Sequence, residues 1–229
     1  MVLVSWLGVT FLTACHKEDS TGNSLGGSTD ITLTKPGSVS TVWGSYGTQS
    51  LSNASLTVVS NDNGRVKYRA TLDISQYPDS LKLKAATLAV QIAEYYKLDS
   101  GAFVLGPNNI LQFDFDLRIS SEGYLDYFTE GKPWIVGRYG DGVGTEYKLV
   151  NDKGEEQVRT VTEKTGQDDW PLTPFLYIKT SEITQYMLSD NPVFEKVIFR
   201  MNHRFGLVYA EYFLRDGTTL KLGIFASFV

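Results

Sequence analysis

Residues 110–119, "ILQFDFDLRI", alternate apolar and polar side chains from Leu111 onward. Successive side chains of a β-strand point to opposite faces of a sheet, so the pattern predicts a strand with one face on the core and one in water. The predicted core face carries Leu111, Phe113, Phe115, Leu117 and Ile119. The predicted solvent face carries Gln112, Asp114, Asp116 and Arg118.

Hairpins are predicted on both sides of this strand. Residues 55–74, "SLTVVSNDNGRVKYRATLDI", hold two alternating runs around Asn63-Gly64, a pair favoured in two-residue hairpin turns. Residues 146–164, "EYKLVNDKGEEQVRTVTEK", predict a second hairpin that turns at Asp152-Lys153-Gly154. The sequence therefore favours antiparallel pairing of neighbouring strands.

Both ends of the globular part also have strand patterns. From Val193 onward the chain predicts a three-strand meander, with turns near Asn202-His203 and at Arg215-Asp216-Gly217. At the other end, "ITLTK" at 31–35 alternates before Pro36-Gly37 and predicts one more strand.

Two stretches depart from the strand period. Residues 80–97 have Leu81, Ala85, Leu88 and Ile92 at helical spacing, which predicts one substantial helix; the alternative is a strand through Leu88 and its neighbours. The stretch "SEITQYML", 181–188, predicts a short helix of about two turns.

These elements predict a mostly β protein, either all-β or α+β. Single-faced strands need a second layer over their apolar side, which an antiparallel β-sandwich or a partly closed, lipocalin-like barrel supplies. The helix near 80–97 would cover an edge or a mouth. We expect a single β-rich domain over 31–229. The order of hairpin, helix and strands recurs loosely in its second part, which suggests two similar halves with a boundary near 120–140.

The first thirty residues differ from the rest of the chain. Residues 1–14, "MVLVSWLGVTFLTA", carry no charge and are too short to span a bilayer, which takes about 20 apolar residues. They fit the apolar part of a secretory signal peptide. The single cysteine, Cys15, follows directly, and residues 16–30 are polar and rich in Gly and Ser, which is typical of a flexible tether.

Leu12-Thr13-Ala14-Cys15 resembles the lipobox of bacterial lipoproteins, a four-residue motif that ends in an obligatory Cys. The following Lys17-Glu18-Asp19 is similar to the tag of Bacteroidota-type lipoproteins that are exported to the cell surface. The resemblance implies that Cys15 becomes the first mature residue and carries diacylglycerol, with a further acyl chain such as palmitate. It implies an outer-membrane protein held by lipid, facing the exterior or, alternatively, the periplasm. It says nothing about the globular body.

Composition argues against several classes of function. The net charge of −5 disfavours a nucleic-acid surface, which would be basic. The two histidines, His16 and His203, lie too far apart in the chain for a zinc pair, so we expect no metal and no cofactor. With Cys15 acylated, no cysteine nucleophile or disulfide remains. The remaining route to catalysis is a pair of carboxylates such as Asp114 and Asp116. The same two residues are also typical of a strand face that is simply exposed to water.

Aromatic residues near polar loops are the strongest candidates for a ligand site. Trp170 follows Asp168 and Asp169, so that ring and carboxylates together suit a sugar. The other candidates are Trp134, Tyr139 and Trp43. We therefore expect a non-catalytic module that binds a glycan, a peptide or a partner protein near the membrane. The alternatives are a lipocalin-like carrier of a small apolar ligand and a glycoside hydrolase that uses acidic residues.

Overall fold

The alternating stretch at 110–119 is a strand, β5 (Ile110–Ser120), as its pattern predicts. Its apolar side chains line the interior of the protein. On its outer face, Asp114 and Asp116 form ion pairs with Arg69 and Arg65 of the neighbouring strand β3 (Arg65–Asp73). The division of β5 into a core face and a solvent face is therefore confirmed.

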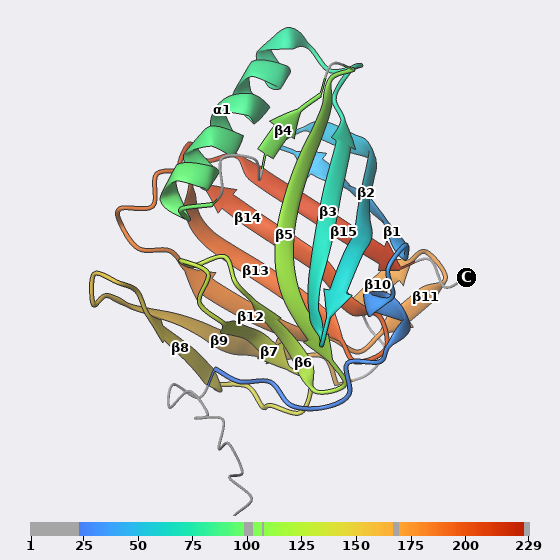
Figure 1. Cartoon of the computed structure of the whole chain (residues 1–229), viewed down its shortest axis with the longest axis vertical. Helices are drawn as coiled ribbons and strands as arrows, with labels where there is room; N and C mark the ends of the chain where they lie inside the picture. Colours follow the sequence, from blue (N-terminus) through green and yellow to red (C-terminus); the bar gives the residue numbers. More distant parts are fainter. Residues whose placement is uncertain (1–22, 99–102, 107, 167–169, 227–229) are drawn as a thin grey trace, which may run out of the picture.

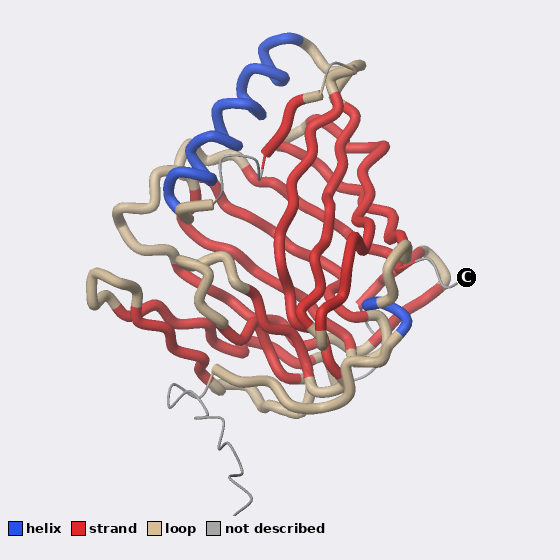
Figure 2. The backbone as a smooth tube through the Cα atoms, viewed as in Figure 1, coloured by secondary structure: helices blue, strands red, loops and turns tan. Residues whose placement is uncertain are grey.

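The computed structural model describes residues 23–98, 103–106, 108–166 and 170–226. Within them the chain is mostly strand, with one α-helix and one 3-10 helix, η1 (Thr32–Thr34) (Figure 2). The other strands of the first half are β1 (Val39–Tyr46), β2 (Gln49–Asp62), β4 (Phe103–Leu105), β6 (Gly123–Asp126) and β7 (Trp134–Arg138). Those of the second half are β8 (Glu146–Val150), β9 (Glu156–Lys164), β10 (Trp170–Thr173), β11 (Leu176–Ile178), β12 (Ser181–Tyr186), β13 (Phe194–Asn202), β14 (Gly206–Leu214) and β15 (Thr219–Ala226).

The main sheet curls into a nearly closed antiparallel barrel (Figure 1). Its strand order is β7-β6-β5-β3-β2-β1-β15-β14-β13-β12-β9-β8, with β4 added beside β5. The two ends of this path, β7 and β8, are held together by side chains: Trp134 Nε1 donates to the Tyr147 carbonyl at 3.1 Å, and the Tyr147 hydroxyl accepts from the Arg138 amide at 3.0 Å. Of the two predicted architectures, the lipocalin-like barrel is confirmed.

The predicted turns fall where the sequence places them. Asn63 and Gly64 both have positive φ, 49° and 91°, as a tight turn between β2 and β3 requires. The turn at Asp152–Gly154 joins β8 to β9. The C-terminal meander is formed by β13, β14 and β15.

The predicted helix is α1 (Asp79–Tyr95). Figure 1 shows it crossing one end of the barrel, next to β4. Its inward face carries the apolar residues that the helical spacing selected, Leu81, Ala85, Leu88 and Ile92, together with Ala89. This end of the barrel is therefore covered by α1.

Two predicted elements are wrong. Residues 181–188 are not a helix, because β12 pairs along both edges, with β9 and with β13, and its Ile183 is fully buried. Among the described residues after Tyr95 there is no further α-helix, so the order of hairpin, helix and strands is seen once there. Residues 31–35 are not a strand either: the Thr34 hydroxyl donates to the Thr29 and Ile31 carbonyls and stabilises a local turn instead.

The last part of the predicted tether belongs to the folded body. Leu25 is buried, and its carbonyl accepts a hydrogen bond from Arg118 at 3.1 Å. Asn23 donates to the Lys148 carbonyl at 2.8 Å, and the Ser28 carbonyl accepts from the Ser121 amide at 2.8 Å. Residues 23–30 therefore lie against the barrel, at the end opposite α1 (Figure 1).

The closely packed part of the core also lies toward this opposite end. Its fully buried members are Val66, Ile119, Leu125, Trp134, Ile135, Val161, Ile183, Val197 and Met201. They come from β3, β5, β6, β7, β9, β12 and β13. The barrel thus has a filled floor, and the space between this floor and α1 contains the candidate site.

Candidate functional site

The interior of the barrel above the floor holds a cavity of about 340 Å³. It lies among inward-facing side chains of the front strands β2, β3 and β5 and of the back strands β1, β14 and β15. The contribution of β5 is the whole apolar face predicted from its sequence: Leu111, Phe113, Phe115, Leu117 and Ile119. Such a space can remove much of the surface of an apolar molecule from water.

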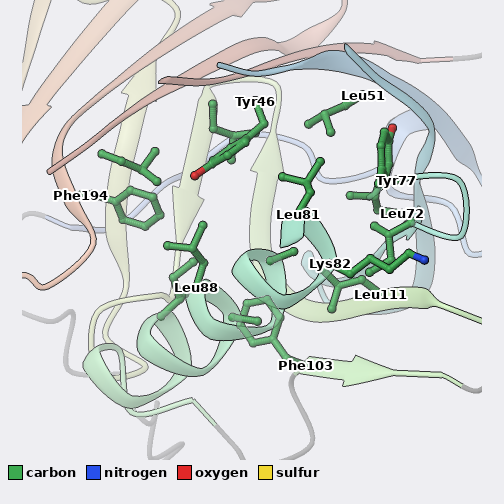
Figure 3. A pocket seen from close by; sticks show the side chains of 16 residues that line it. Tyr46, Leu51, Leu72, Tyr77, Leu81, Lys82, Leu88, Phe103, Leu111 and Phe194 are labelled. Carbon is green, nitrogen blue, oxygen red and sulfur yellow. The ribbon is translucent and has the colours of Figure 1, made fainter. Parts of the chain in front are cut away.

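A second cavity, of about 200 Å³, lies between α1 and the rim of the barrel (Figure 3). Its walls are almost entirely apolar. It shares four lining residues with the first cavity: Leu51, Leu72, Leu111 and Leu220. Because the same side chains border both spaces, the two cavities lie next to each other, one beneath α1 and one nearer the floor.

Stacked aromatic rings build one wall of this interior. Phe113 lies between Phe103 and Phe115, with ring centroids 4.2 Å and 5.2 Å away. Phe115 stacks in turn on Tyr68 and on Phe128, at 5.8 Å and 5.5 Å. Offset and stacked rings add to the energy of burial, so this wall is well ordered without a ligand.

An ion pair closes the lower end of the larger cavity. Asp126, which borders the cavity, accepts a hydrogen bond from Arg159 at 2.7 Å, and both side chains are almost fully buried. Burial raises the pKa of Asp126, and the Arg159 charge opposes this shift. Arg159 also donates to Gln185 and lies over the Trp134 ring, 3.7 Å from its centroid. Each charge is thus satisfied by protein groups, so the pair forms a neutral floor.

Polar contacts hold α1 over the upper cavity. Lys84 forms an ion pair with Asp216, in the turn between β14 and β15, at 2.7 Å. Hydrogen bonds from Lys84 and Thr218 lower the pKa of Asp216 to about 2. Farther along the helix, the Tyr95 hydroxyl contacts the Asp190 carboxylate at 3.4 Å. The helix is therefore attached by surface bonds around an apolar contact.

Two of the predicted aromatic residues are not available to a ligand on the surface. Trp134 is fully buried in the floor, where its indole N–H bonds to the Tyr147 carbonyl, so its ring is not presented to a ligand on the outer surface. Tyr139 is half-buried and packs edge-on against Tyr124, with ring centroids 6.4 Å apart. Both residues stabilise the closure of the barrel instead.

Trp43 and Trp170 lie on the outer face of the barrel. Trp43 is half exposed and rests on Gly223 of β15, where an added Cβ would come within 2.3 Å of the indole. Gly223 pairs with Tyr209 of β14, and Trp170 packs on Tyr209 with ring centroids 5.4 Å apart. The structure therefore brings Trp43 and Trp170 to one outer surface, with Tyr209 between them. Tyr209 was not among the residues predicted from the sequence.

The remaining predicted site residues divide into two groups. Asp168, Asp169 and Cys15 lie outside the described residues. Asp114 and Asp116 are described, and each is neutralised by an arginine on the outer face rather than aimed across a cleft. This arrangement gives no support to a two-carboxylate hydrolase.

The described residues offer neither a metal site nor a membrane-spanning helix. Among the described residues, no group of three or more His, Cys, Asp or Glu side chains is placed to hold a metal ion. Within the same part of the chain, no helix is both long and apolar enough to cross a membrane. A scan against protein-family models and searches of curated proteins and of solved structures found no match.

The sequence singled out Tyr46, beside Trp43, but not its place at the interior, and it did not single out the buried pair of Asp126 and Arg159. Tyr46 lies two residues beyond Gly44 on the inward face of β1, and the large outward Trp43 obscures the alternation there. In β9, the buried, inward residues include Gln157 and Arg159. Their polarity would assign this inward face of the strand to solvent.

Proposed function

We propose that this protein is a carrier that binds a small apolar ligand inside its barrel while anchored to the outer membrane by lipid on Cys15. The observation that supports the proposal is the pair of neighbouring, mostly apolar cavities between α1 and the floor. Ligand sites are concave, mostly apolar spaces of roughly 300–1,000 Å³ with a few polar groups. The larger cavity alone reaches this range.

Burial of apolar surface supplies the affinity in such a site. Each Å² of apolar surface removed from water contributes about 25 cal/mol, so a chain-like ligand that fills both cavities gains several kcal/mol before the costs of association. The ligand would occupy space that no side chain fills. The packed core residues of the floor therefore need not move when the ligand binds.

The anchor belongs to the same proposal. The lipobox-like Leu12–Cys15 follows an apolar leader, and two or more acyl chains give stable membrane attachment. The described chain begins at Asn23, at the end of the barrel opposite α1 (Figure 1). The helix-covered end is thus remote from the point where the anchor enters the fold, which suits exchange of ligand away from the membrane surface.

The test is a titration of the purified protein with the neutral fluorescent probe N-phenyl-1-naphthylamine. We expect saturable binding that the substitution Ala70→Trp abolishes, because Ala70 of β3 borders the larger cavity. The matched control is Lys67→Trp, which places the same ring on the outer face of the same strand. Thermal unfolding of each variant reports whether the barrel is intact. Probe binding that survives Ala70→Trp in a folded barrel would refute the carrier function.

A second candidate function is glycan binding on the outer face. The observation that favours it is that Gly223 leaves room for Trp43 to lie on the sheet, in line with Tyr209 and Trp170. Aromatic faces presented in this way pack against sugar rings. An affinity-gel screen against polysaccharides tests it, with Trp43→Ala expected to abolish retardation and the outer-face variant Lys67→Ala expected to leave it unchanged. Equal migration of the wild-type and Trp43→Ala proteins in every gel would remove this function.

A further inference from the structure

One hydroxyl group on the wall of the larger cavity has no partner among the described residues. Tyr212 of β14 borders this cavity, and its hydroxyl makes no hydrogen bond to any of them. Its ring is held in place by Phe194 and Phe199, with centroids 5.2 Å and 6.4 Å away. Unlike the buried, unpaired hydroxyl of Thr180, this oxygen is not completely covered by neighbouring atoms. The Tyr212 hydroxyl is therefore open to a group that enters the cavity.

The carboxylate of Asp126 borders the same cavity and has unused capacity to accept hydrogen bonds. One of its oxygens accepts from Arg159 at 2.7 Å, and the other accepts from the Phe128 amide at 3.3 Å. A carboxylate has about four acceptor sites, so each oxygen can accept once more. Arg159 balances the charge of Asp126 but does not itself line the cavity. The cavity therefore meets a hydrogen-bond acceptor whose charge is already compensated from behind.

Tyr212 and Asp126 influence each other without a direct hydrogen bond. Burial raises the pKa of Tyr212 to about 12; the nearby Asp126 carboxylate adds to this rise, and Arg159 opposes it. The two oxygens of Asp126 bond to Arg159 and to a backbone amide, and not to the Tyr212 hydroxyl. A hydroxyl group can donate one hydrogen bond and accept others. A single ligand hydroxyl can therefore bridge the two residues by accepting from Tyr212 and donating to Asp126.

Other polar side chains on this wall are already engaged with the protein. The Tyr68 hydroxyl donates to a backbone carbonyl, and the Ser55 and Thr71 hydroxyls bond to each other at 2.9 Å. Most of the remaining lining is apolar. A ligand with one polar group would thus place that group at Tyr212 and Asp126 and leave its apolar part among the other side chains.

We infer that the ligand of the larger cavity is an uncharged alcohol with an apolar body, whose hydroxyl accepts a hydrogen bond from Tyr212 and donates one to Asp126. This inference rests on the proposed carrier function and adds the chemical class of the ligand. A ligand carboxylate would place a second negative charge beside Asp126. A ligand ammonium would find the charge of Asp126 already balanced by Arg159, and an ether would have no proton to donate.

The experiment measures displacement of N-phenyl-1-naphthylamine by 1-dodecanol and by its isomer 1-methoxyundecane, which has the same composition but no hydroxyl proton. We expect the alcohol to bind the wild-type protein at least about tenfold more tightly, because only the alcohol can donate to the carboxylate. Dodecanoate at neutral pH should bind less tightly than 1-dodecanol. These comparisons probe Asp126 without a substitution that would disturb the floor.

A pair of Tyr→Phe variants tests the other half of the bridge. Tyr212→Phe keeps the ring and removes the hydroxyl, so we expect it to weaken binding of 1-dodecanol about fivefold to tenfold and to leave probe affinity unchanged. The control Tyr68→Phe removes another hydroxyl from the same wall and should keep the affinity for 1-dodecanol, since that hydroxyl serves the Leu33 carbonyl. Thermal unfolding shows whether both variants are folded.

The outcomes distinguish this inference from the function on which it rests. If the probe fails to bind the wild-type protein, the carrier function itself is wrong. If the probe binds but 1-dodecanol and 1-methoxyundecane compete equally well, the carrier function stands and the alcohol is excluded. Tighter binding of dodecanoate than of 1-dodecanol, or a folded Tyr212→Phe protein that keeps the full affinity for 1-dodecanol, would also overturn the inference.

Discussion

Arg159 and Asp126 form a buried ion pair at the floor of the barrel. Their side chains are 4% and 2% exposed, and the guanidinium nitrogen lies 2.7 Å from the carboxylate oxygen. Arg159 makes further hydrogen bonds to Gln185 and to the carbonyls of Trp134 and Ile135. The pair joins β6 to β9 across the seam between β7 and β8, so it connects closure of the barrel with the lower wall of the cavity.

Removing one charge of this pair should destabilise the fold strongly. We expect Asp126→Asn to lower the free energy of unfolding by about 3–5 kcal/mol, because it leaves the Arg159 charge buried without its counterion. Chemical denaturation measures the change. The matched control is Glu156→Gln, which breaks the exposed pair with Lys148 and should cost no more than about 1 kcal/mol. Equal effects of the two substitutions would show that the floor pair is not structural.

Trp134 should behave as a core residue and not as a ligand platform. We expect Trp134→Phe to lower the free energy of unfolding by about 1–3 kcal/mol, since it leaves the Tyr147 carbonyl without its donor at the seam. Trp43→Phe, on the outer face, should change it by less than about 0.5 kcal/mol. Denaturant unfolding followed by circular dichroism checks both. If Trp43→Phe lowered the free energy of unfolding more than Trp134→Phe, the assignment of Trp134 to the core and Trp43 to the outer face would be wrong.

The ion pair of Lys84 and Asp216 should control how often α1 leaves the barrel. Its partners hold the pKa of Asp216 at about 2, below the value of about 3.9 for a free aspartate. Because the folded state lowers this pKa, the contribution to stability is complete above the unfolded value and is lost as the pH falls through about 2. Acidification from pH 5 toward pH 2 should therefore loosen the helix.

Hydrogen exchange of the α1 amides measures this effect. At neutral pH, Asp216→Asn should speed exchange in α1 and leave the strands unchanged, with a cost of at most about 1 kcal/mol, as for other exposed pairs. Asp79→Asn, which breaks the pair with Lys82 inside the helix, serves as the control and should not increase detachment. Exchange in α1 that is identical in wild type and Asp216→Asn would contradict the role of this pair.

The fold could be predicted from sequence wherever local patterns decide it. The face of β5, the turn at Asn63-Gly64 and the helix at Asp79–Tyr95 all follow from spacing within a few residues. The strand at Ser181–Tyr186 could not be predicted, because its Ile183 and Met187 also fit a helical period. Only pairing with β9 and β13, which lie elsewhere in the chain, determines its conformation.

The candidate site was predictable only in part. The apolar face of β5 indicates an interior, but whether such side chains fill it or surround an open space depends on the number and tilt of the barrel strands. Arg159 lies on the inward face of β9 although polar residues usually face water. The burial of Trp134 could not be predicted, because an aromatic residue near a loop gives no sign of whether it points inward.

Lipid attachment at Cys15 is a separate prediction. Mass spectrometry of the mature protein from an exporting bacterium should find Cys15 as the first residue, carrying diacylglycerol. Cys15→Ser should remain uncleaved or be released from membranes by washing, because it has no sulfur to acylate. An unmodified Cys15, in a protein that salt washes from membranes, would show that the protein has no lipid anchor at this residue.

The carrier function is tested most sharply by a crystal structure of the protein with a brominated apolar ligand, because anomalous scattering locates the bromine. We expect a bromine peak in the larger cavity, near Phe115 and Leu222. Bromine found only on the outer surface, or an interior filled by protein side chains, would contradict it.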